Sequence, residues 1–400
     1  MHIAFISSDR AKDGGFDRDT ALIEALEALG VEVTIIVPCH PFAYGFERSR
    51  AWVFRRLGYN VSTACDASRL RLLANSIEEA LRVSSADVIF SRSTHFTAWL
   101  DTHLPKVNYV DAVFDCIVDF YPSHTHLDFL SRWAGHRAEK RALAHSSLTL
   151  LKSFWAAAKA INCYRIAGPQ LGVVQAPAIL PFEPSRSEVL SARSGGREDL
   201  KCLIIGNDWL RKGADIALEA VRQTRIMGLD VSLTTLGMEA PSHLTLVPWL
   251  KILPPLQKGN PAEFFKFCQI FLDADVLLLP ARADFSPNVI SEAYAFGLPT
   301  IGSPVGAIPE MIEHGQTGFV TRRVDDAEEY AKFICRIATE PGLRSHMAIE
   351  SRNKYEAEFA LPVVARKIVS HLESVIYQTA AFHKNDSQPS HRKTMRCQIP

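Results

Sequence analysis

Two carboxylates, Asp284 and Glu292, lie eight residues apart around a predicted turn from a strand into a helix. Residues 274–280, ADVLLLP, form a continuous apolar run that predicts a strand buried on both faces. We expect Asn288 to cap the helix that follows. The free amides and the dipole at a helix start favour an anion such as a diphosphate, and carboxylates accept hydrogen bonds from sugar and ribose hydroxyls. This stretch therefore predicts a site for a sugar nucleotide.

A second strand, turn and helix are predicted over residues 199–221. The turn contains Gly206, and Arg211, Lys212 and Gly213 stand at the mouth of the helix. Cations and free backbone amides at this place could converge on one anion. A solvated helix end that carries two surface cations is the alternative, and the residues alone leave it open.

The order of Asp284, Phe285, Ser286, Asn288 and Glu292, followed by FGLP and the PE of 309–310, resembles the E-x7-E signature of retaining GT-B glycosyltransferases of group 1. Asp284 stands where these enzymes have the first glutamate and is one methylene shorter. The resemblance implies that Asp284 binds hydroxyls of the transferred sugar and that Glu292 binds the ribose.

The same resemblance extends to residues 199–221. It implies that Lys212 neutralises the donor diphosphate. The family often has an arginine five residues before this lysine, but this chain has Asn207, so Arg211 is the neighbour most able to supply the charge.

The resemblance also assigns roles in the first half of the chain. Gly14 and Gly15 match a pair that faces the donor phosphates. Asp111 follows a predicted strand where the family commonly has a histidine that contacts the transferred sugar, so the identity of any general base is open. His95 follows the preceding strand as a candidate acceptor or sugar contact, or as an ordinary loop histidine.

The implied site has catalytic residues and donor-binding residues. The catalytic residues are Asp111, Asp284 and Lys212. The donor-binding residues are Gly14, Gly15, Asn207, Arg211, Lys212, Asp284, Phe285, Ser286, Asn288, Val289 and Glu292. The implied reaction moves a hexosyl unit from a UDP-sugar or GDP-sugar to a hydroxyl of a glycan or lipid-linked acceptor, with retention and without a metal ion.

The implied fold is α/β GT-B, with two Rossmann-like domains that face a central cleft. We expect an N-terminal acceptor domain over 1–180, a linker over 181–199 and a donor domain over 200–361. A helix over about 362–380 should cross back to the first domain, and residues 384–400 should be disordered.

Composition narrows the class of protein. The 400 residues are 47% hydrophobic and 22% charged, which suits two domains of ordinary size. The net charge is zero and no basic stripe appears, so nucleic acid is not an expected partner. No apolar run approaches the roughly twenty residues of a membrane span, no secretory signal is visible, and the eight cysteines lack a C-x-x-C pair. These features predict a cytoplasmic protein, and the family resemblance implies a role in polysaccharide or glycoconjugate biosynthesis.

Residues 38–56 mix aromatic and cationic side chains. Contact with an anionic lipid head group at the inner membrane face, contact with a glycan, and simple packing against the sheet are the three alternatives for this segment.

Other classes of protein share doubly wound sheets. A nicotinamide-dependent oxidoreductase needs a glycine fingerprint after the first strand and an acid after the second, and the second predicted strand here ends in IIVPCH. A GT-B epimerase or phosphorylase would also bind a sugar phosphate. A catalytically silent sugar-nucleotide or glycan-binding GT-B protein is the main alternative, because Asn207, Asp111 and Asp284 depart from the family pattern.

Overall fold

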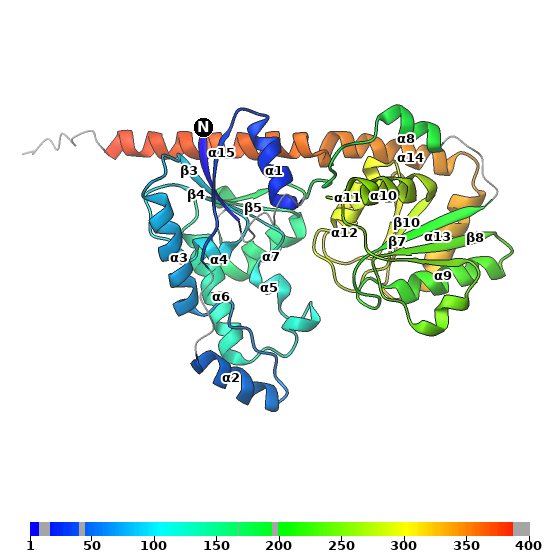
Figure 1. Cartoon of the computed structure of the whole chain (residues 1–400), viewed down its shortest axis with the longest axis horizontal. Helices are drawn as coiled ribbons and strands as arrows, with labels where there is room; N and C mark the ends of the chain where they lie inside the picture. Colours follow the sequence, from blue (N-terminus) through cyan, green and yellow to red (C-terminus); the bar gives the residue numbers. More distant parts are fainter. Residues whose placement is uncertain (8–16, 40–44, 167, 194–198, 387–400) are drawn as a thin grey trace, which may run out of the picture.

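The computed structural model describes residues 1–7, 17–39, 45–166, 168–193 and 199–386. Figure 1 shows two α/β domains side by side, with the long helix α15 (Leu361–Asp386) running along the N-terminal domain. Each domain contains a sheet of six strands, and every pairing between the strands is parallel. The predicted architecture of two α/β domains with parallel sheets is confirmed.

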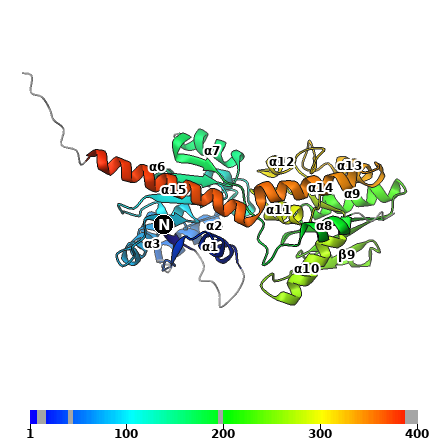
Figure 2. The ribbon, with the colours of Figure 1, turned by 90° about the horizontal axis from the view of Figure 1, so that it is seen from above.

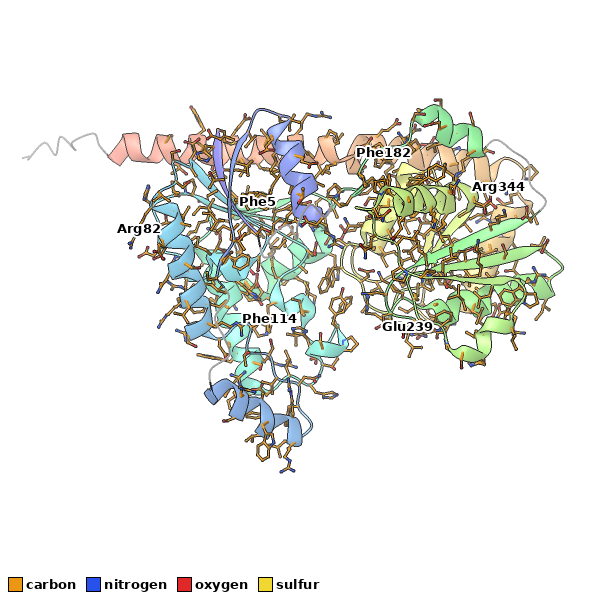
Figure 3. All side chains as sticks on the ribbon, in the orientation of Figure 1. Phe5, Arg82, Phe114, Phe182, Glu239 and Arg344 are labelled. Carbon is orange, nitrogen blue, oxygen red and sulfur yellow. The ribbon has the colours of Figure 1, made fainter. Side chains whose placement is uncertain are left out.

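The N-terminal sheet has the strand order β2-β1-β3-β4-β5-β6. Its strands are β1 (His2–Ile6), β2 (Glu32–Ile36), β3 (Val88–Ser91), β4 (Lys106–Val110), β5 (Leu148–Leu151) and β6 (Leu171–Val173). Side chains of β1 alternate between the two faces: Ile3 and Phe5 pack with α15, whereas Ala4 and Ile6 pack against helices of the opposite layer. Figure 3 labels Phe5 and Phe114, which lie in these two core clusters.

Besides α15, which also packs on it, the described part of the N-terminal domain contains seven α-helices. They are α1 (Arg18–Glu27), α2 (Gly45–Arg56), α3 (Ala67–Leu81), α4 (Thr94–Thr97), α5 (Phe114–Ile117), α6 (Phe129–Ala144) and α7 (Phe154–Tyr164). Short 3-10 turns follow at η1 (Pro122–His124) and η2 (Gly168–Gln170). Helix α2 lies at the tip of the domain that is farthest from α15 (Figure 1).

The C-terminal sheet has the strand order β12-β11-β10-β7-β8-β9. Its strands are β7 (Leu200–Ile205), β8 (Val231–Leu236), β9 (Leu250–Leu253), β10 (Val276–Leu279), β11 (Thr300–Gly302) and β12 (Gly318–Val320). The helices are α9 (Ala214–Ile226), α10 (Pro261–Asp273), α11 (Asn288–Ala295), α12 (Ile308–Met311), α13 (Ala327–Thr339) and α14 (Leu343–Lys354), with η3 (Ser242–Leu246) and the π-turn η4 (Tyr355–Phe359). All four residues of β10 are buried, and they alternate between the two cores of the domain, as the apolar run of 274–280 predicts.

The segment predicted as a linker, 181–199, contains a helix, α8 (Arg186–Arg193). Buried Arg193 donates to the carbonyl oxygens of Phe271, Ala274 and Phe296, which lie at the carboxyl ends of α10 and α11. The sequence analysis missed this helix because its anchoring contacts are made with residues far along the chain.

Two crossings connect the domains, one after β6 and one at Ala360. The Ala178 amide donates to the Phe359 carbonyl at 2.9 Å, so the two crossings are hydrogen-bonded to each other. Helix α15 then packs its apolar side on the N-terminal core, which confirms the predicted return (Figure 2). It continues through residues 384–386, for which the sequence predicts disorder, whereas residues 387–400 lie outside the described residues. None of the helices in the described ranges is long and apolar enough to span a bilayer.

One buried carboxyl lies in the N-terminal core. Glu139 on α6 is 3% exposed. One of its oxygens accepts from the Thr94 hydroxyl at 3.0 Å, and the other has no partner among the described residues. Burial raises the pKa of Glu139 from 4.5 to about 7, although the Thr94 hydrogen bond opposes this rise.

Glu139→Gln should therefore stabilise the protein in a pH-dependent way. Between pH 4.5 and about 7 the unfolded carboxyl is ionised while the folded one keeps its proton, so folding stability falls as the pH rises through this window. The neutral amide removes this loss. We expect the melting temperature of the variant to exceed that of the wild type by a few degrees at pH 8 and to match it at pH 4.5. Exposed Glu79→Gln is the control, and an equal shift at both pH values would contradict the assignment.

Candidate active site

A cavity of about 490 Å³ lies between the two domains. The N-terminal domain contributes Arg18, Asp111 and Tyr121. The C-terminal domain contributes the ends of β7, β8, β9 and β10 with the loops that follow them, one residue of α10 and the start of α11. Its lining residues are Ile205, Gly206, Asn207, Arg211, Lys212, Leu236, Gly237, Pro255, Leu256, Lys258, Phe267, Asp284, Phe285, Ser286, Pro287, Asn288, Val289 and Glu292. These residues meet because the carboxyl ends of parallel strands share one edge of the sheet.

Lys212 and Asp284 form an ion pair in this cavity. The Lys212 Nζ lies 2.5 Å from Asp284 Oδ2, and the two side chains are 13% and 11% exposed. The lysine reaches this position by crossing the backbone of Gly206: a Cβ added there would lie 2.5 Å from Lys212 Cγ. Only a glycine at 206 therefore leaves room for this path of the lysine side chain.

Glu292 forms a second ion pair with a lysine that the sequence analysis missed. The Nζ of Lys258 lies 2.5 Å from Glu292 Oε1 and also donates to the Ile179 carbonyl at 3.1 Å. The ammonium group lies 4.8 Å from the centre of the Phe267 ring. Lys258 stands in an ordinary polar loop before α10, so only the folded chain shows that it meets Glu292.

The side chain of Arg211 lies beside Asn207, the position where the resembled family often has an arginine. Its guanidinium donates to Asn207 Oδ1 at 2.7 Å and to the Ala283 carbonyl at 3.1 Å. The same group lies 5.6 Å from the centre of the Tyr121 ring, which belongs to the N-terminal domain. The guanidinium is thus held in the cavity next to Lys212.

The loop from Asp284 to the start of α11 is fixed from two sides. The Phe285 ring packs among Phe120, Tyr121 and Trp155 of the other domain, with centroid distances of 4.7 to 5.9 Å. On its other side the loop touches Gly306, where an added Cβ would lie 2.0 Å from the Asp284 carbonyl oxygen.

Ser286 lies in the same loop. Its hydroxyl is buried and has no hydrogen-bond partner within the described residues. A ligand in the cavity could supply one.

Asn288 does not cap α11, so that prediction is wrong. The cap position is Pro287, whose backbone is extended, and Asn288 is already the first helical residue. Its side-chain amide instead donates to the Pro177 carbonyl of the first crossing at 2.8 Å. Without a side-chain cap, the first amides of α11 remain available to an anion in the cavity.

Asp111 follows β4 and forms an ion pair with Lys152, which follows the neighbouring strand β5 and is 3% exposed. Burial would raise the pKa of Asp111, but the Lys152 ammonium, with Arg92 and Arg18, holds it below its ordinary value. Burial lowers the pKa of Lys152 to about 8, against the opposing effect of Asp111. Asp111 is thus an ionised acceptor at neutral pH. The sequence analysis did not single out Lys152, although its place after a buried strand was a usable signal.

One described site residue predicted from the sequence is not brought to the cavity. His95 lies on α4 with its Nε2 3.3 Å from the Cys65 sulfur, and it is absent from the cavity lining. Burial lowers the pKa of His95, which favours its neutral form. Gly14 and Gly15 lie outside the described residues. Among the residues that the structure describes, no group of three His, Cys, Asp or Glu side chains could hold a metal ion.

A carboxylate joins the two domains beside the cavity. Glu310 on α12 accepts from the amides of Phe154 and Trp155, at 2.7 and 2.5 Å, at the start of α7. The Ser153 hydroxyl accepts from the next amide, Ala156, so the side chains of two domains together satisfy the first turn of α7.

Glu310→Ala should loosen the contact between the domains, because it removes two charge-assisted hydrogen bonds and leaves two helix amides without that acceptor. We expect an increase in the radius of gyration measured by solution X-ray scattering. Glu313→Ala is the matched control, since Glu313 pairs with Lys354 within the C-terminal domain. An unchanged radius in the Glu310 variant would show that the aromatic contacts of Phe285 are sufficient.

Part of the C-terminal half is similar to a known protein family. Residues 199–340 match the family model described as glycosyl transferases group 1. The chain is 32% identical over 112 residues to N-acetyl-alpha-D-glucosaminyl L-malate synthase of Bacillus anthracis, covering 28% of each protein. It is 28% identical over 202 residues to the amylovoran biosynthesis glycosyltransferase AmsK of Erwinia amylovora, covering 48% of this chain and 49% of that protein. The matches thus span half or less of the length of these relatives.

Solved structures show the fold over nearly the whole chain. Sucrose-phosphate synthase from Thermosynechococcus elongatus superposes with a TM-score of 0.69 at 16% identity, covering 94% of this chain and 99% of that one. Anabaena HepE in complex with UDP-glucose gives a TM-score of 0.61 at 18% identity, covering 94% and 100%. The C-terminal domain is therefore similar to the group 1 glycosyltransferases over residues 199–340, and the whole chain has the GT-B fold.

Proposed function

We propose that the protein transfers a hexosyl unit from a nucleoside diphosphate sugar to an acceptor hydroxyl, with retention at the anomeric carbon. The observation that carries the proposal is the pairing of Lys212 with Asp284 in the cavity between the domains, with the Arg211 guanidinium beside them. The cavity thus contains cations that could bind the diphosphate of a sugar nucleotide and carboxylates that could accept hydrogen bonds from its hydroxyls.

The diphosphate would be bound by Lys212, Arg211, the Ser286 hydroxyl and the uncapped amides of α11. As the bond from the anomeric carbon to the diphosphate breaks, negative charge grows on the departing oxygen. Fixed cations and amides in an enclosed cavity stabilise that charge more strongly than water does. The family resemblance implies that backbone amides of Gly14 and Gly15 would also bind the diphosphate.

The carboxylates would bind the neutral parts of the donor. Asp284 would accept from hydroxyls of the transferred sugar, and Glu292, oriented by Lys258, would accept from the ribose. Asp111 would accept from a hydroxyl of the sugar or the acceptor, and the buried Lys152 keeps it ionised for that role.

UDP is the favoured nucleotide of the donor and glucose is one candidate sugar, because HepE, which shares the fold, was crystallised in complex with UDP-glucose. GDP is the second choice. We further propose that no metal ion is required, that the acceptor is a glycan or a lipid-linked sugar, and that the reaction serves polysaccharide or glycoconjugate biosynthesis in the cytoplasm. AmsK, a relative over 202 residues, is named for such a biosynthesis.

A thermal-shift panel with UDP, GDP, ADP and NAD, with Mg²⁺ or EDTA, tests the donor site. At about a hundred times Kd, a ligand stabilises the folded state by about 2.7 kcal/mol, a shift of several degrees. We expect one nucleoside diphosphate to give this shift, equally with EDTA, and Lys212→Ala to abolish it. A shift with NAD alone would overturn the proposal.

Gly206→Ala sharpens this test, because it changes no charged group and only obstructs the path of Lys212. We expect it to lose most of the nucleotide shift. Gly168→Ala is the matched control, since an added Cβ there meets no atom within 4 Å. Retention of the full shift by Gly206→Ala would show that Lys212 does not bind the diphosphate in this position.

Glu292→Gln should lower kcat/KM for the donor about ten- to a hundredfold, the effect of weakening hydrogen bonds to a charged acceptor. Because this change also leaves Lys258 without its ion pair, the double variant Glu292→Gln/Lys258→Met serves as the control. We expect the double variant to remain as slow as the single one. Recovery of activity would mean that Glu292 acts only as a partner of Lys258.

Transfer itself is measured as release of the nucleoside diphosphate from its sugar in the presence of an acceptor. Nucleotide binding without any turnover, across a panel of UDP- and GDP-sugars, would favour the catalytically silent alternative. That alternative rests on Asn207, Asp111 and Asp284, the three departures from the family pattern.

A further inference from the structure

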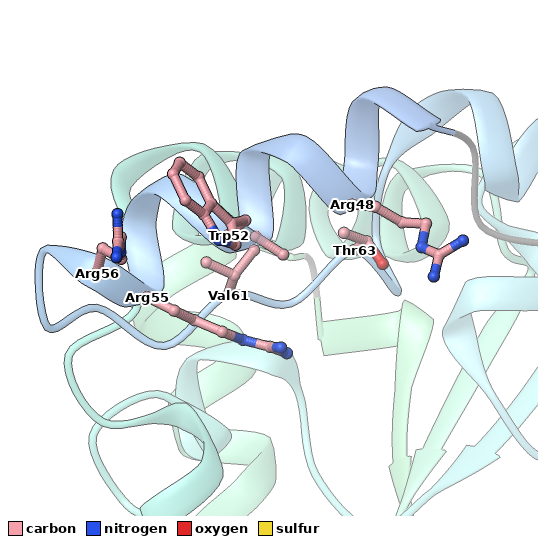
Figure 4. Close-up of a pocket in the computed structure, with 7 residues that line it drawn as sticks. Arg48, Trp52, Arg55, Arg56, Val61 and Thr63 are labelled. Carbon is pink, nitrogen blue, oxygen red and sulfur yellow. The ribbon is translucent and has the colours of Figure 1, made fainter.

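Helix α2 carries an exposed face of aromatic and cationic side chains far from the donor cavity. A groove of about 570 Å³ is lined by Arg48, Ala51, Trp52, Arg55, Arg56, Val61 and Thr63. Figure 4 shows Arg48 at one end of the helix and Trp52 and Arg56 together near the other. Trp52 is 62% exposed and Leu57, which follows the helix, is 65% exposed. Large apolar side chains at such exposure mark a contact surface when they are held rigidly.

The opposite side of α2 holds the helix in place. The Arg50 guanidinium is 8% exposed and donates to Asp66 at 3.2 Å, to the Ser62 carbonyl at 3.1 Å and to the Ser131 hydroxyl at 3.0 Å. The Phe54 ring lies 6.0 Å from the Phe129 ring on α6. The outward face is thus presented by an anchored helix and is not a consequence of loose packing.

Exposed aromatic side chains also lie on α6, the helix that α2 contacts through Phe54 and Phe129. Phe129 is 67% exposed and Trp133, one turn further along α6, is 58% exposed. The Arg137 guanidinium lies 5.1 Å from the Trp133 ring, and Arg56 lies 4.7 Å from the Trp52 ring. Each exposed tryptophan therefore has an arginine against its ring, an arrangement that joins an apolar body to a cationic head.

The charged side chains that line the groove are all arginines. Residues 48–65 contain four arginines between the acids Glu47 and Asp66. Arg50 is paired with Asp66, whereas Arg48, Arg55 and Arg56 form no ion pair with any described residue. The whole chain has a net charge of zero, so the positive surface is local. An anionic partner is indicated.

We propose that the face of α2 formed by Arg48, Trp52, Arg55 and Arg56, continued on α6 by Phe129 and Trp133, binds a membrane surface rich in anionic phospholipid. Guanidinium groups fit lipid phosphates in a bidentate way, and tryptophan partitions to the interface between head groups and acyl chains. An amphipathic helix that lies in the interface combines these two contributions. A soluble polyanion would use the arginines but would leave the exposed Trp52, Leu57, Phe129 and Trp133 without a partner.

This contact does not depend on the proposed transferase activity. It would place the N-terminal domain against the bilayer and leave the donor cavity open to the nucleotide in solution. Of the three alternatives for residues 38–56, it selects the anionic lipid head group.

Vesicle flotation of the full chain tests the proposal. The vesicles are phosphatidylcholine alone or phosphatidylcholine with about one-third phosphatidylglycerol. We expect binding only to the anionic vesicles, weakening as salt rises. Charge reversal of three arginines, Arg48→Glu, Arg55→Glu and Arg56→Glu together, should lower the partition coefficient by more than about a hundredfold, because loss of each basic residue near the surface costs about fivefold and each new carboxylate is also repelled. Trp52→Ala alone should lower it severalfold.

The control reverses three exposed arginines elsewhere, Arg71→Glu, Arg82→Glu and Arg322→Glu, so that the net charge changes equally. It should bind vesicles as the wild type does within a few-fold. The melting temperature and the nucleotide shift are measured on every variant, so failure of the donor site is distinguished from failure of this surface.

Equal binding to neutral vesicles, absence of binding to anionic ones, or an equal loss in the control would overturn the proposal. Arginine-dependent binding to a soluble sulfated polysaccharide, without vesicle binding, would assign the surface to a polyanion in place of a membrane.

Discussion

Burial of both faces of each parallel sheet is the constraint on which the rest of this molecule depends. In β1 every side chain after His2, and in β10 every side chain, lies in an apolar cluster on one face of the sheet or the other. The charged groups of the cavity then lie where the strands end. Asp111 after β4, Lys152 after β5, Lys212 after β7 and Asp284 after β10 all follow from this one constraint.

The charges at these strand ends form pairs. Lys212 binds Asp284, Lys258 binds Glu292 and Lys152 binds Asp111. Removing ions from water is costly unless each finds an opposite charge, so pairing makes a highly charged site compatible with a partly enclosed cavity. A sugar nucleotide carries both kinds of group that could replace these partners: phosphates for the lysines and hydroxyls for the carboxylates. The resting contacts and the proposed bound contacts thus use the same side chains.

Sequence patterns predicted the elements that are set by local chemistry. The apolar run of 274–280 predicted β10, and the helix that follows 284 was placed correctly, although its cap was assigned to Asn288 in place of Pro287. Residues whose role depends on distant contacts were missed. Lys258 meets Glu292 from a loop 34 residues away, Glu310 meets α7 from the other domain, and α8 is anchored through Arg193 to two later helices. Nothing in the residues next to them marks these positions, because their partners are set by the arrangement of the domains.

The hydrogen bond between the two chain crossings also limits how the domains can move. The chain passes between the domains after β6 and again at Ala360, and the Ala178 amide holds these two passages together. Connections joined at one place act as a pivot: they allow the domains to swing but resist sliding of one past the other. Asn288 and Lys258, which line the cavity, donate to the Pro177 and Ile179 carbonyls on either side of Ala178, so the cavity begins at that pivot. A rotation there would change the separation between Arg211 and Tyr121, which belong to different domains. Opening and closing of the cavity would then be one hinge rotation about the two crossings.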